Sequence, residues 1–432
     1  MAWTKFLNSF KSDFLKVSIW SGIAAVVRMV VNLAISKILA VFVGPSGFAL
    51  VGQLQNGLAI FRTISTGAIS TGVTKYVAEN GSDKEQQTTY IKAAIRITSI
   101  CSAITSILIL IFSRFISLYL FQQDAYIDIV VFFGIGLSLF AFNGLFLAIV
   151  NGKKEFKKFI IASISGACLT LLLTVIFVFS WGLYGAFLAF AIAQSLVFFV
   201  TTYMIRSNLK FWFSGFLNKA VSTGPYINLF KFALMALTSA VLAPFVQILI
   251  RNHIIDQVSL TDAGIWEGMN KISTTYLGLI TLSLTTYYLP RISEIKDNLK
   301  VKSEVKKTLI VIFPIMLIGT VIIFMLRAYI IKLLFTDEFM SMESLFGIQL
   351  VGDVFKISSW ILSFVMLAKA MTKLFIITEI VFSILLYTLS IYLVNSLGLI
   401  GSTYAYTINY ILYFFMLAFV LNSHLKKTIT NI

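Results

Sequence analysis

LVGDVFKISSWILSFVMLAKAMTK, from Leu350 to Lys373, is the stretch that decides the fold. Its length and apolarity suit one membrane crossing, which needs about 20 apolar residues. It nevertheless carries Asp353 and Lys356 near one end, on one helix face, and Lys369 near the other. A charge at the centre of an inserted helix costs about 2.5 to 3.5 kcal/mol, so such residues normally face a bundle interior or a wet cavity. We therefore expect this helix to line a polar path through a membrane.

The rest of the chain has the composition of a polytopic membrane protein. Hydrophobic residues make up 59% of the 432 residues, charged residues make up 12%, and 40 residues are Phe. The net charge of +16 would indicate a nucleic-acid partner in a soluble protein, but here the basic residues gather in short loops between apolar runs, which indicates topology instead. Cys101 and Cys168 fall inside apolar segments, while His253 and His424 stand apart, so we expect no disulfide, no metal site and no cofactor.

Counting about 20 apolar residues per crossing predicts an all-α protein of twelve transmembrane helices. The first six lie near residues 14–42, 47–77, 89–112, 126–150, 158–180 and 183–205. The second six lie near residues 227–252, 262–289, 306–328, 345–369, 373–394 and 398–421. Lys and Arg gather in alternate loops, which places both termini in the cytoplasm. The connections are short, as in the GPSG turn at 44–47, and leave no room for the catalytic loop that a membrane polymerase or glycosyltransferase needs.

The remaining segments receive their own predictions. Residues 1–13 place apolar residues at helical spacing with lysines among them, which suits an interfacial amphipathic helix; a frayed lead-in to the first span is the alternative. We expect one six-helix bundle over 14–210, a cytoplasmic linker over 211–226, a second six-helix bundle over 227–422 and a cytoplasmic tail over 423–432.

The two predicted halves look like copies of one another, because five landmarks recur after 215 to 217 residues. The pairs are Phe14-Leu15-Lys16 with Leu229-Phe230-Lys231, Gly47 with Gly264, Glu79 with Glu294, Lys153 with Lys369, and residues 182–185 with 398–401. Six helices per half is an even number, so both copies enter from the same side of the membrane and are related by an axis along its normal. This is a transporter architecture whose cleft is complete in one chain, so we expect a monomer.

Cations inside the spans are the main functional signal. We expect a cationic, substrate-binding cavity that accepts a phosphorylated substrate and is lined by Arg28, Lys37, Arg62, Lys231 and Lys356. Arg28 and Arg62 carry this prediction best, because neither has an acidic residue within one helical turn. We expect these residues to bind the substrate, and we expect no catalytic residues.

Acidic neighbours give the other cations a second interpretation. Asp353 with Lys356, and Glu267 with Lys271, are spaced three and four residues apart, so each pair can be a helix-local ion pair that neutralises itself. Asp353 and Glu379 are in turn candidates for proton coupling, since carboxyls in a poorly hydrated cleft can exchange protons.

Two more cations occupy corresponding cytoplasmic helix ends. Lys75 lies in GVTKYVAE at 72–79, and Arg291 lies in YYLPRISE at 287–294. Ordinary positive-inside anchoring is one interpretation. The other is an inner gate that meets an anionic headgroup.

These stretches also carry a resemblance. GVTKYVAE, KFALMAL at 231–237, AGIWEGMNKIS at 263–273, YYLPRISEI at 287–295 and QLVGDVFK at 349–356 together resemble the lipid III flippase and O-antigen translocase family. That family belongs to the superfamily of multidrug-and-toxin-extrusion (MATE) exporters and lipid II flippases. The resemblance spans nearly the whole chain. It implies a MATE-like fold and a flippase that moves undecaprenyl-pyrophosphate-linked oligosaccharide from the cytoplasmic to the periplasmic face of a bacterial inner membrane, by alternating access driven by proton exchange.

The resemblance also bears on single residues. The residues that match the pattern of this family are Arg28, Lys37, Lys231, Asp353, Lys356, Lys369 and Glu379. The residues that depart from it are Arg62, Glu267 and Lys271. The partners it implies are the lipid-linked glycan, membrane lipid and polysaccharide polymerase or assembly proteins, with no nucleic acid. A multidrug or small-molecule antiporter of the same fold is the alternative; its typical cationic substrates would be repelled by a chamber of Arg and Lys.

Overall fold

The computed structural model describes the backbone of residues 2–213, 223–295 and 297–430, and it is helical with no strand in that part of the chain. Nine helical runs among these residues are long and apolar enough to cross a membrane, so this is a multi-span membrane protein. The predicted interfacial helix at 1–13, most of the linker at 211–226 and nearly all of the tail at 423–432 lie outside the residues whose side chains are described. Predictions that depend on those side chains stay predictions.

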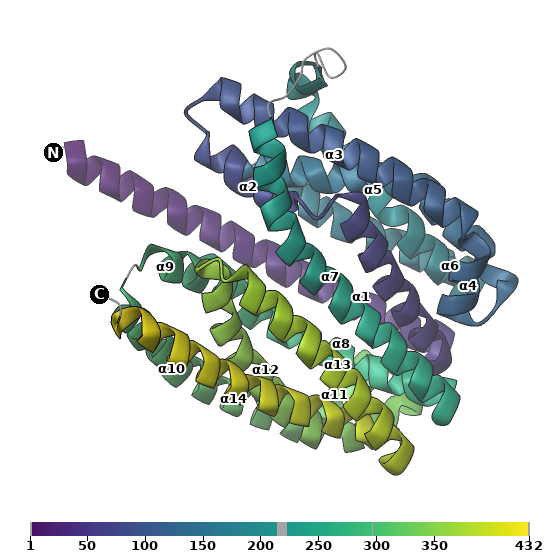
Figure 1. The fold of residues 1–432 in the computed structure, drawn as a ribbon. Coiled ribbons are helices and arrows are strands. Elements are labelled where there is room, and N and C mark those ends of the chain that lie inside the picture. The colour runs from purple at the N-terminus through teal and green to yellow at the C-terminus, as the bar shows by residue number, and fades with distance from the viewer. Residues whose placement is uncertain (1, 214–222, 296, 431–432) are drawn as a thin grey trace. The chain divides into compact units, whose positions relative to one another are not determined.

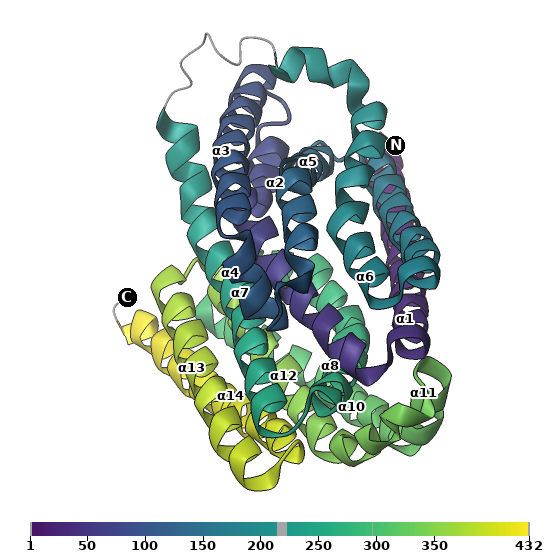
Figure 2. The ribbon, with the colours of Figure 1, turned by 90° about the vertical axis from the view of Figure 1, so that its right-hand side faces the viewer.

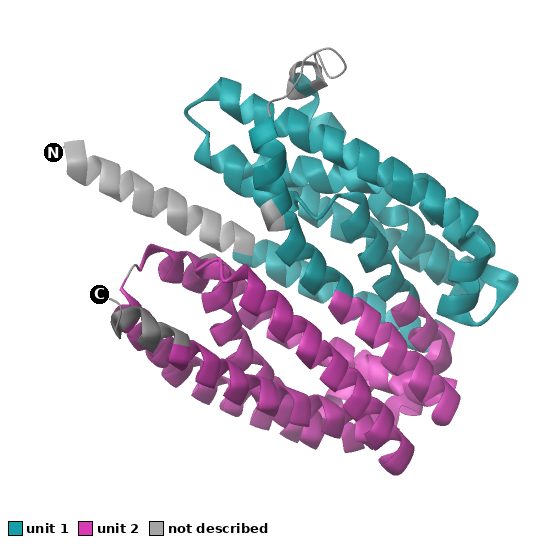
Figure 3. Ribbon diagram, in the orientation of Figure 1, with its two compact units in different colours: residues 1–42, 54–241 teal, residues 43–53, 242–432 magenta. Residues whose placement is uncertain are grey.

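The chain divides into two compact units (Figure 3). Unit 1 holds residues 1–42 and 54–241, and unit 2 holds residues 43–53 and 242–432. The first eight elements are α1 (Ala2–Ser65), α2 (Ser70–Glu79), α3 (Lys84–Ile111), α4 (Ser113–Phe121), η1 (Asp124–Tyr126), α5 (Ile127–Gly152), α6 (Phe156–Phe213) and α7 (Thr223–Gln257) (Figure 1). The remaining elements are α8 (Leu260–Ser283), the π-helical turn η2 (Leu284–Tyr288), α9 (Leu289–Glu294), α10 (Asn298–Met325), α11 (Arg327–Leu334), η3 (Asp337–Met342), α12 (Glu343–Ala368), α13 (Thr372–Leu397) and α14 (Ile400–Thr430).

Two of the long helical runs contain the turns that the sequence predicts. In α1 the backbone breaks at Gly44, whose φ of 63° suits a residue without a Cβ, and Pro45 follows with no N–H to donate. In α6 the break falls at Trp181 and Gly182, between the predicted spans 158–180 and 183–205. Both predicted turns are confirmed.

Two predicted spans are interrupted. The span over 47–77 ends at Ser65, and α2 restarts at Ser70 after Gly67 and Ala68 adopt positive φ values of 65° and 53°. The span over 262–289 turns π-helical at Leu284 before α9 begins. Neither break follows a proline, and the polar residues before the first one, within 62–66, are flanked by apolar sequence, so counting apolar residues did not separate these segments.

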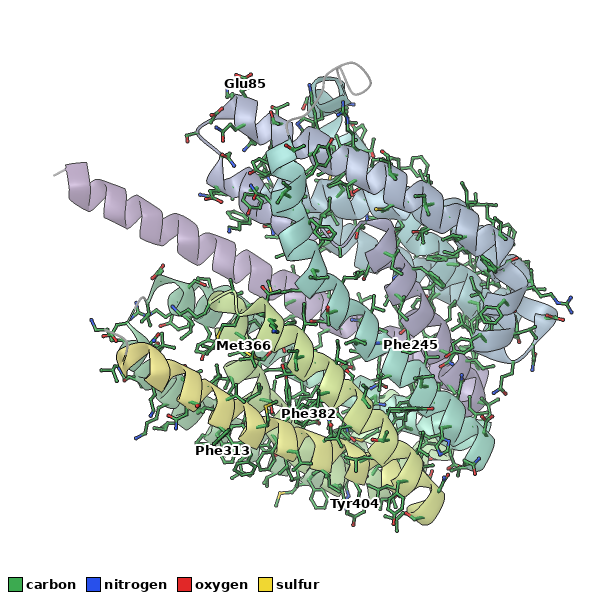
Figure 4. The ribbon with its side chains drawn as sticks, viewed as in Figure 1. Glu85, Phe245, Phe313, Met366, Phe382 and Tyr404 are labelled. Atoms are coloured by element: carbon green, nitrogen blue, oxygen red, sulfur yellow. The ribbon has the colours of Figure 1, made fainter. Side chains whose placement is uncertain are left out.

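One helix lies at the centre of each unit. In unit 1, α5 contacts α2, α3, α4 and α6, and Figure 2 shows α3 and α5 running alongside one another. In unit 2, α12 contacts α8, α9, α10, α13 and α14. In the apolar run that contains α12, 67% of the apolar 18-residue segment is buried, a larger share than in any other of the nine runs. Phe382 of α13 packs inside unit 2, whereas the half-exposed Phe313 and Tyr404 lie toward its outer edge in Figure 4. The stretch from Leu350 to Lys373 is thus the centre of its unit.

The internal repeat is confirmed in detail between residues 127–185 and 343–401. α12 begins and ends 216 residues after α5 begins and ends, from Ile127 to Glu343 and from Gly152 to Ala368. The same interval joins Lys154 to Ala370, two non-glycine residues with positive φ, and joins Gly182 to Gly398, the positive-φ glycines of the following breaks. Each unit therefore builds the same helix, turn, helix and break from different residues.

The break in each repeat places a glycine against the backbone of the preceding helix. A Cβ on Gly401 would collide with the Leu393 carbonyl group, and one on Gly185 would collide with that of Phe177. A Cβ on Gly319, in α10, would meet nothing within 4 Å. The repeated glycine is therefore a steric requirement of the turn.

We predict that Gly401→Ala and Gly185→Ala each lower the melting temperature of the detergent-purified protein by several degrees, because the backbone of the break must move. Gly319→Ala should leave it unchanged or raise it slightly, since alanine is favoured over glycine in a helix by about 0.5 to 1 kcal/mol. Thermal unfolding followed by size-exclusion chromatography measures all three. Equal stability of the three variants would contradict the steric account.

Candidate functional site

Asp353 is the most deeply buried acidic side chain of unit 2, with an exposed fraction of 0%. Its Oδ2 accepts hydrogen bonds from the Ser273 hydroxyl at 2.7 Å and from the Tyr276 hydroxyl, and its Oδ1 accepts one from the Tyr406 hydroxyl at 2.6 Å. The donors come from α8 and α14, on two sides of α12. A carboxylate accepts several hydrogen bonds and donates none, so this shell of three donors matches its chemistry.

Lys356, one turn farther along α12, lies among three aromatic rings. Its Nζ is 5.3 Å from the ring centroid of Trp360 and 5.1 Å from those of Tyr406 and Tyr410. These are cation–π distances. Asp353 and Lys356 attract each other at longer range, but no ion pair within 4.0 Å joins these two described residues. The helix-local ion pair that the spacing allowed is therefore replaced by contacts with α8, with α14 and with Trp360 of α12.

A row of tyrosines links the two predicted proton-coupling carboxyls. Tyr406, Tyr410 and Tyr413 lie on one face of α14. Tyr406 binds Asp353, and the Tyr413 hydroxyl donates to Glu379 Oε1 of α13 at 3.0 Å. The ring of Tyr410 lies 4.8 Å from that of Tyr406 and 6.5 Å from that of Tyr413. Asp353, Lys356 and Glu379 thus share one aromatic cluster within unit 2.

The predicted cations of unit 1 have different surroundings. Arg28 is half-buried in α1, and its guanidinium has no hydrogen-bond or ion-pair partner among the residues whose side chains are described. Lys37 is half-buried nine residues farther along α1. Lys231 lies in α7, outside the described side chains, so its placement in the cavity stays a prediction.

Arg62 is held by its own unit. Its Nη2 donates to the Phe190 carbonyl oxygen at 3.2 Å, and its Cζ lies 4.6 Å from the centroid of the Phe140 ring. Its Nε is buried with no hydrogen-bond partner in the described part of the chain. The guanidinium therefore keeps part of its hydrogen-bonding capacity unused.

The cations near the predicted cytoplasmic ends are tied to local groups. Lys75 is exposed and lies 5.1 Å from the Tyr76 ring centroid, and Arg291 is exposed with its Nε 3.9 Å from Glu304. Lys369, just past α12, donates to the Ile295 carbonyl oxygen, and burial lowers its pKa. These contacts are compatible both with anchoring at the membrane surface and with a gate.

Sequence reasoning missed a buried polar network in unit 2. Arg251 of α7 has an exposed fraction of 0%, pairs with Glu267 of α8, and donates from Nη1 to Gln53 Oε1 of α1 at 2.6 Å. Gly52 makes room for this pair, because a Cβ there would lie 2.6 Å from the Glu267 Cδ. The predicted span 227–252 ends one residue after Arg251, whereas α7 continues to Gln257 and buries this arginine. The signal that could have found it is an arginine inside a predicted span, directly after the apolar residues 248–250.

Residues 14–296 match the profile of the family described as polysaccharide biosynthesis protein. The chain belongs to that family. It is 28% identical over 399 residues to a lipid III flippase of Escherichia coli (strain K12), covering 92% of this chain and 96% of the relative. It is 23% identical over 406 residues to a putative O-antigen transporter of Shigella flexneri, covering 93% and 96%. The resemblance noted in the sequence is confirmed.

Solved structures agree on the fold. An inward-facing multidrug-resistance MATE transporter superposes with a TM-score of 0.74 at 17% identity, covering 94% of this chain and 99% of that one. A lipid II flippase in an inward closed conformation superposes with a TM-score of 0.73 at 16% identity, covering 94% and 87%. At such identities the likeness shows the fold alone.

Among the described residues, no group of three or more His, Cys, Asp or Glu is placed to hold a metal ion.

We predict that Glu267→Gln lowers the melting temperature in detergent by about 5 °C or more, because removing one partner of a buried ion pair costs about 3 to 5 kcal/mol. The matched control is Asp124→Asn, whose partner Arg114 forms an exposed pair with side chains 75% and 47% exposed. That variant should shift the melting temperature by no more than about 1 °C. A shift of the same size in both variants would show that the buried network does not stabilise unit 2.

Proposed function

We propose that this protein is a flippase that moves undecaprenyl-pyrophosphate-linked oligosaccharide, an O-antigen or related surface-glycan repeat unit, from the cytoplasmic to the periplasmic leaflet of a bacterial inner membrane. The observation that carries the proposal is the end-to-end similarity to the lipid III flippase of Escherichia coli, with 96% of that relative covered. The similarity to a putative O-antigen transporter points to the same substrate class. The protein binds and moves its substrate, with no covalent step.

The charges of the membrane helices support an anionic substrate. Arg28 keeps its guanidinium free of partners among the described side chains, and Arg62 keeps a buried Nε unpaired. A pyrophosphate offers charged oxygen acceptors that guanidinium and ammonium groups bind strongly. In this proposal Arg28, Lys37, Arg62 and Lys231 hold the pyrophosphate while the prenyl chain stays in lipid, because exposing so long an apolar chain to water is unfavourable.

The proposal includes a topology finer than the nine apolar runs. Dividing α1 at Gly44 and α6 at Trp181–Gly182, and counting α8, gives twelve crossings. We propose two six-helix halves, over 14–210 and 227–422, in a monomer with both termini in the cytoplasm. The basic loops support this orientation.

Alternating access is the transport mode that we infer for this fold, with Lys75 and Arg291 near the cytoplasmic entrance. We propose that Asp353 and Glu379 couple transport to protons. The row of tyrosines between these two carboxyls supports this role, because a tyrosine hydroxyl can both donate and accept a hydrogen bond. Polysaccharide polymerase or assembly proteins are the partners that would use the flipped product.

We predict that Arg28→Ala lowers the initial flipping rate at least tenfold, since a lost charge-assisted hydrogen bond is worth about 1.5 to 3 kcal/mol. In the assay the protein is reconstituted in vesicles with a glycan-bearing polyprenyl pyrophosphate. The measured quantity is the fraction of glycan that an external glycosidase can cleave, followed over time. The control is Arg206→Ala, an exposed arginine whose Cζ lies 4.6 Å from the Tyr203 ring centroid. Equal rates for the two variants would remove Arg28 from the binding site.

We predict that Asp353→Asn abolishes the dependence of flipping on a pH gradient, because the amide cannot exchange a proton. Glu379→Gln should have the same effect if both carboxyls act. The measurement compares initial rates with and without an imposed gradient. Wild-type gradient dependence in the Asp353→Asn variant would exclude that carboxyl from the coupling.

A further inference from the structure

Unit 2 contains a pocket beside Lys356 that the pyrophosphate site does not use. Its volume is about 400 Å³, within the range of small-molecule sites. One wall is α8 with the start of η2, and the other is the face of α12 that carries Lys356 and Trp360, four residues apart. All of its lining residues belong to unit 2.

The α8 wall is a stripe of hydroxyls with a gap. Thr274, Gly278, Thr281 and Thr285 line the pocket at intervals of four, three and four residues, which places them on one helix face. The three hydroxyls donate to carbonyls of their own helix turns at 2.8 to 3.0 Å, so their oxygens remain available as acceptors. Nothing lies within 4 Å of the position that a Cβ on Gly278 would take. Leu277 and Leu282 complete this wall, so it combines hydroxyl acceptors with apolar side chains. Such a wall suits a ligand that has both hydroxyl donors and apolar C–H groups.

The α12 wall is aromatic and close to neutral in charge. The Lys356 ammonium is surrounded by three rings, and the Asp353 carboxylate lies three residues before it. One cation balanced by one anion binds a pyrophosphate poorly, because the ligand's repulsion from Asp353 offsets its attraction to Lys356. The indole of Trp360 offers an apolar face with a polar edge. A pyranose ring, with C–H groups on its faces and hydroxyls on its rim, matches both walls.

The pocket is specific to one repeat. At the interval of 216 residues, Leu137, Phe140 and Gly144 of α5 correspond to Asp353, Lys356 and Trp360 of α12. Arg62 places its guanidinium on Phe140, the counterpart of Lys356, so both units have a cation against an aromatic ring at this level. Only unit 2 adds the acid and the indole. The contact between a cation and an aromatic ring, which both units share, suits a role common to both. The acid and the indole of unit 2 suit the selection of a ligand.

We propose that this pocket binds an uncharged sugar ring of the transported glycan and selects the saccharide that is accepted. The inference rests on the proposed function, and it names Trp360 and Thr281 as the specificity-determining residues. Lys356 then orients the ring by donating from its ammonium group. This reassigns Lys356 from the pyrophosphate to the sugar.

The test measures competition during flipping. Vesicles containing the protein and a labelled glycan-bearing polyprenyl pyrophosphate are challenged with the same lipid unlabelled, or with polyprenyl pyrophosphate that carries no sugar. The ratio of the two half-inhibiting concentrations measures the contribution of the sugar. The variants are Trp360→Leu and the milder Thr281→Val. The matched control is Thr388→Val, which removes an exposed α13 hydroxyl that donates to Ile384 at 3.1 Å.

We expect both pocket variants to raise the half-inhibiting concentration of the glycan lipid at least fivefold and to leave that of the sugar-free lipid unchanged. Thr388→Val should preserve both values. The sugar site is overturned if the ratio of the two half-inhibiting concentrations is unchanged in both pocket variants, or if the binding of both lipids weakens equally. Either result leaves the flipping activity itself in place. A wild-type protein that moves no lipid overturns the proposed function and this inference together.

Discussion

A carboxylate in a membrane helix needs hydrogen-bond donors, and Asp353 shows how this chain meets that requirement. An unpaired charge at the centre of a membrane helix costs about 2.5 to 3.5 kcal/mol, a large part of the stability of a fold. Ser273 and Tyr276 of α8 and Tyr406 of α14 supply the donors, so the acid fixes the positions of two helices against α12. The same tyrosine places its ring against Lys356. Burial of one acid therefore organises the polar centre of unit 2.

The repeats show what the fold requires and what one copy adds. Both units keep a 26-residue central helix, a turn with a positive-φ residue and a following glycine break. At the position of Asp353, unit 1 has Leu137, and both side chains are 0% exposed. A leucine needs only apolar packing there, whereas the aspartate needs donors from other helices. The backbone is thus shared, while only the central helix of unit 2 has a buried acid at this position.

Much of this fold followed from the sequence, because apolar runs bounded by charges mark membrane helices. The predicted spans at 126–150 and 345–369 match α5 and α12 within two residues at each end. The break at Gly67–Ala68 and the π-helical turn after Ser283 did not follow, since both fall inside runs long enough to be counted as single spans. The partners of Asp353 did not follow either. Tyr406 lies 53 residues away in sequence, and helical spacing predicts only neighbours on the same helix.

The buried pair of Arg251 and Glu267 illustrates the same limit. Spacing offered Lys271 as the partner of Glu267, four residues along one helix, but the carboxylate pairs with an arginine of the preceding helix. Gln53, which completes the network, is 198 residues from Arg251. The sequence predicts that such charges need partners, and the three-dimensional fold decides which partners they find.

We propose that the charged interior serves an anionic lipid-linked glycan rather than an organic cation. The direct measurement places the wild-type protein in one set of vesicles and follows two processes, flipping of a glycan-bearing polyprenyl pyrophosphate and efflux of a soluble organic cation. We expect protein-dependent flipping, with no cation efflux above that of empty vesicles. Cation efflux without flipping would contradict it and would leave the fold serving a different substrate.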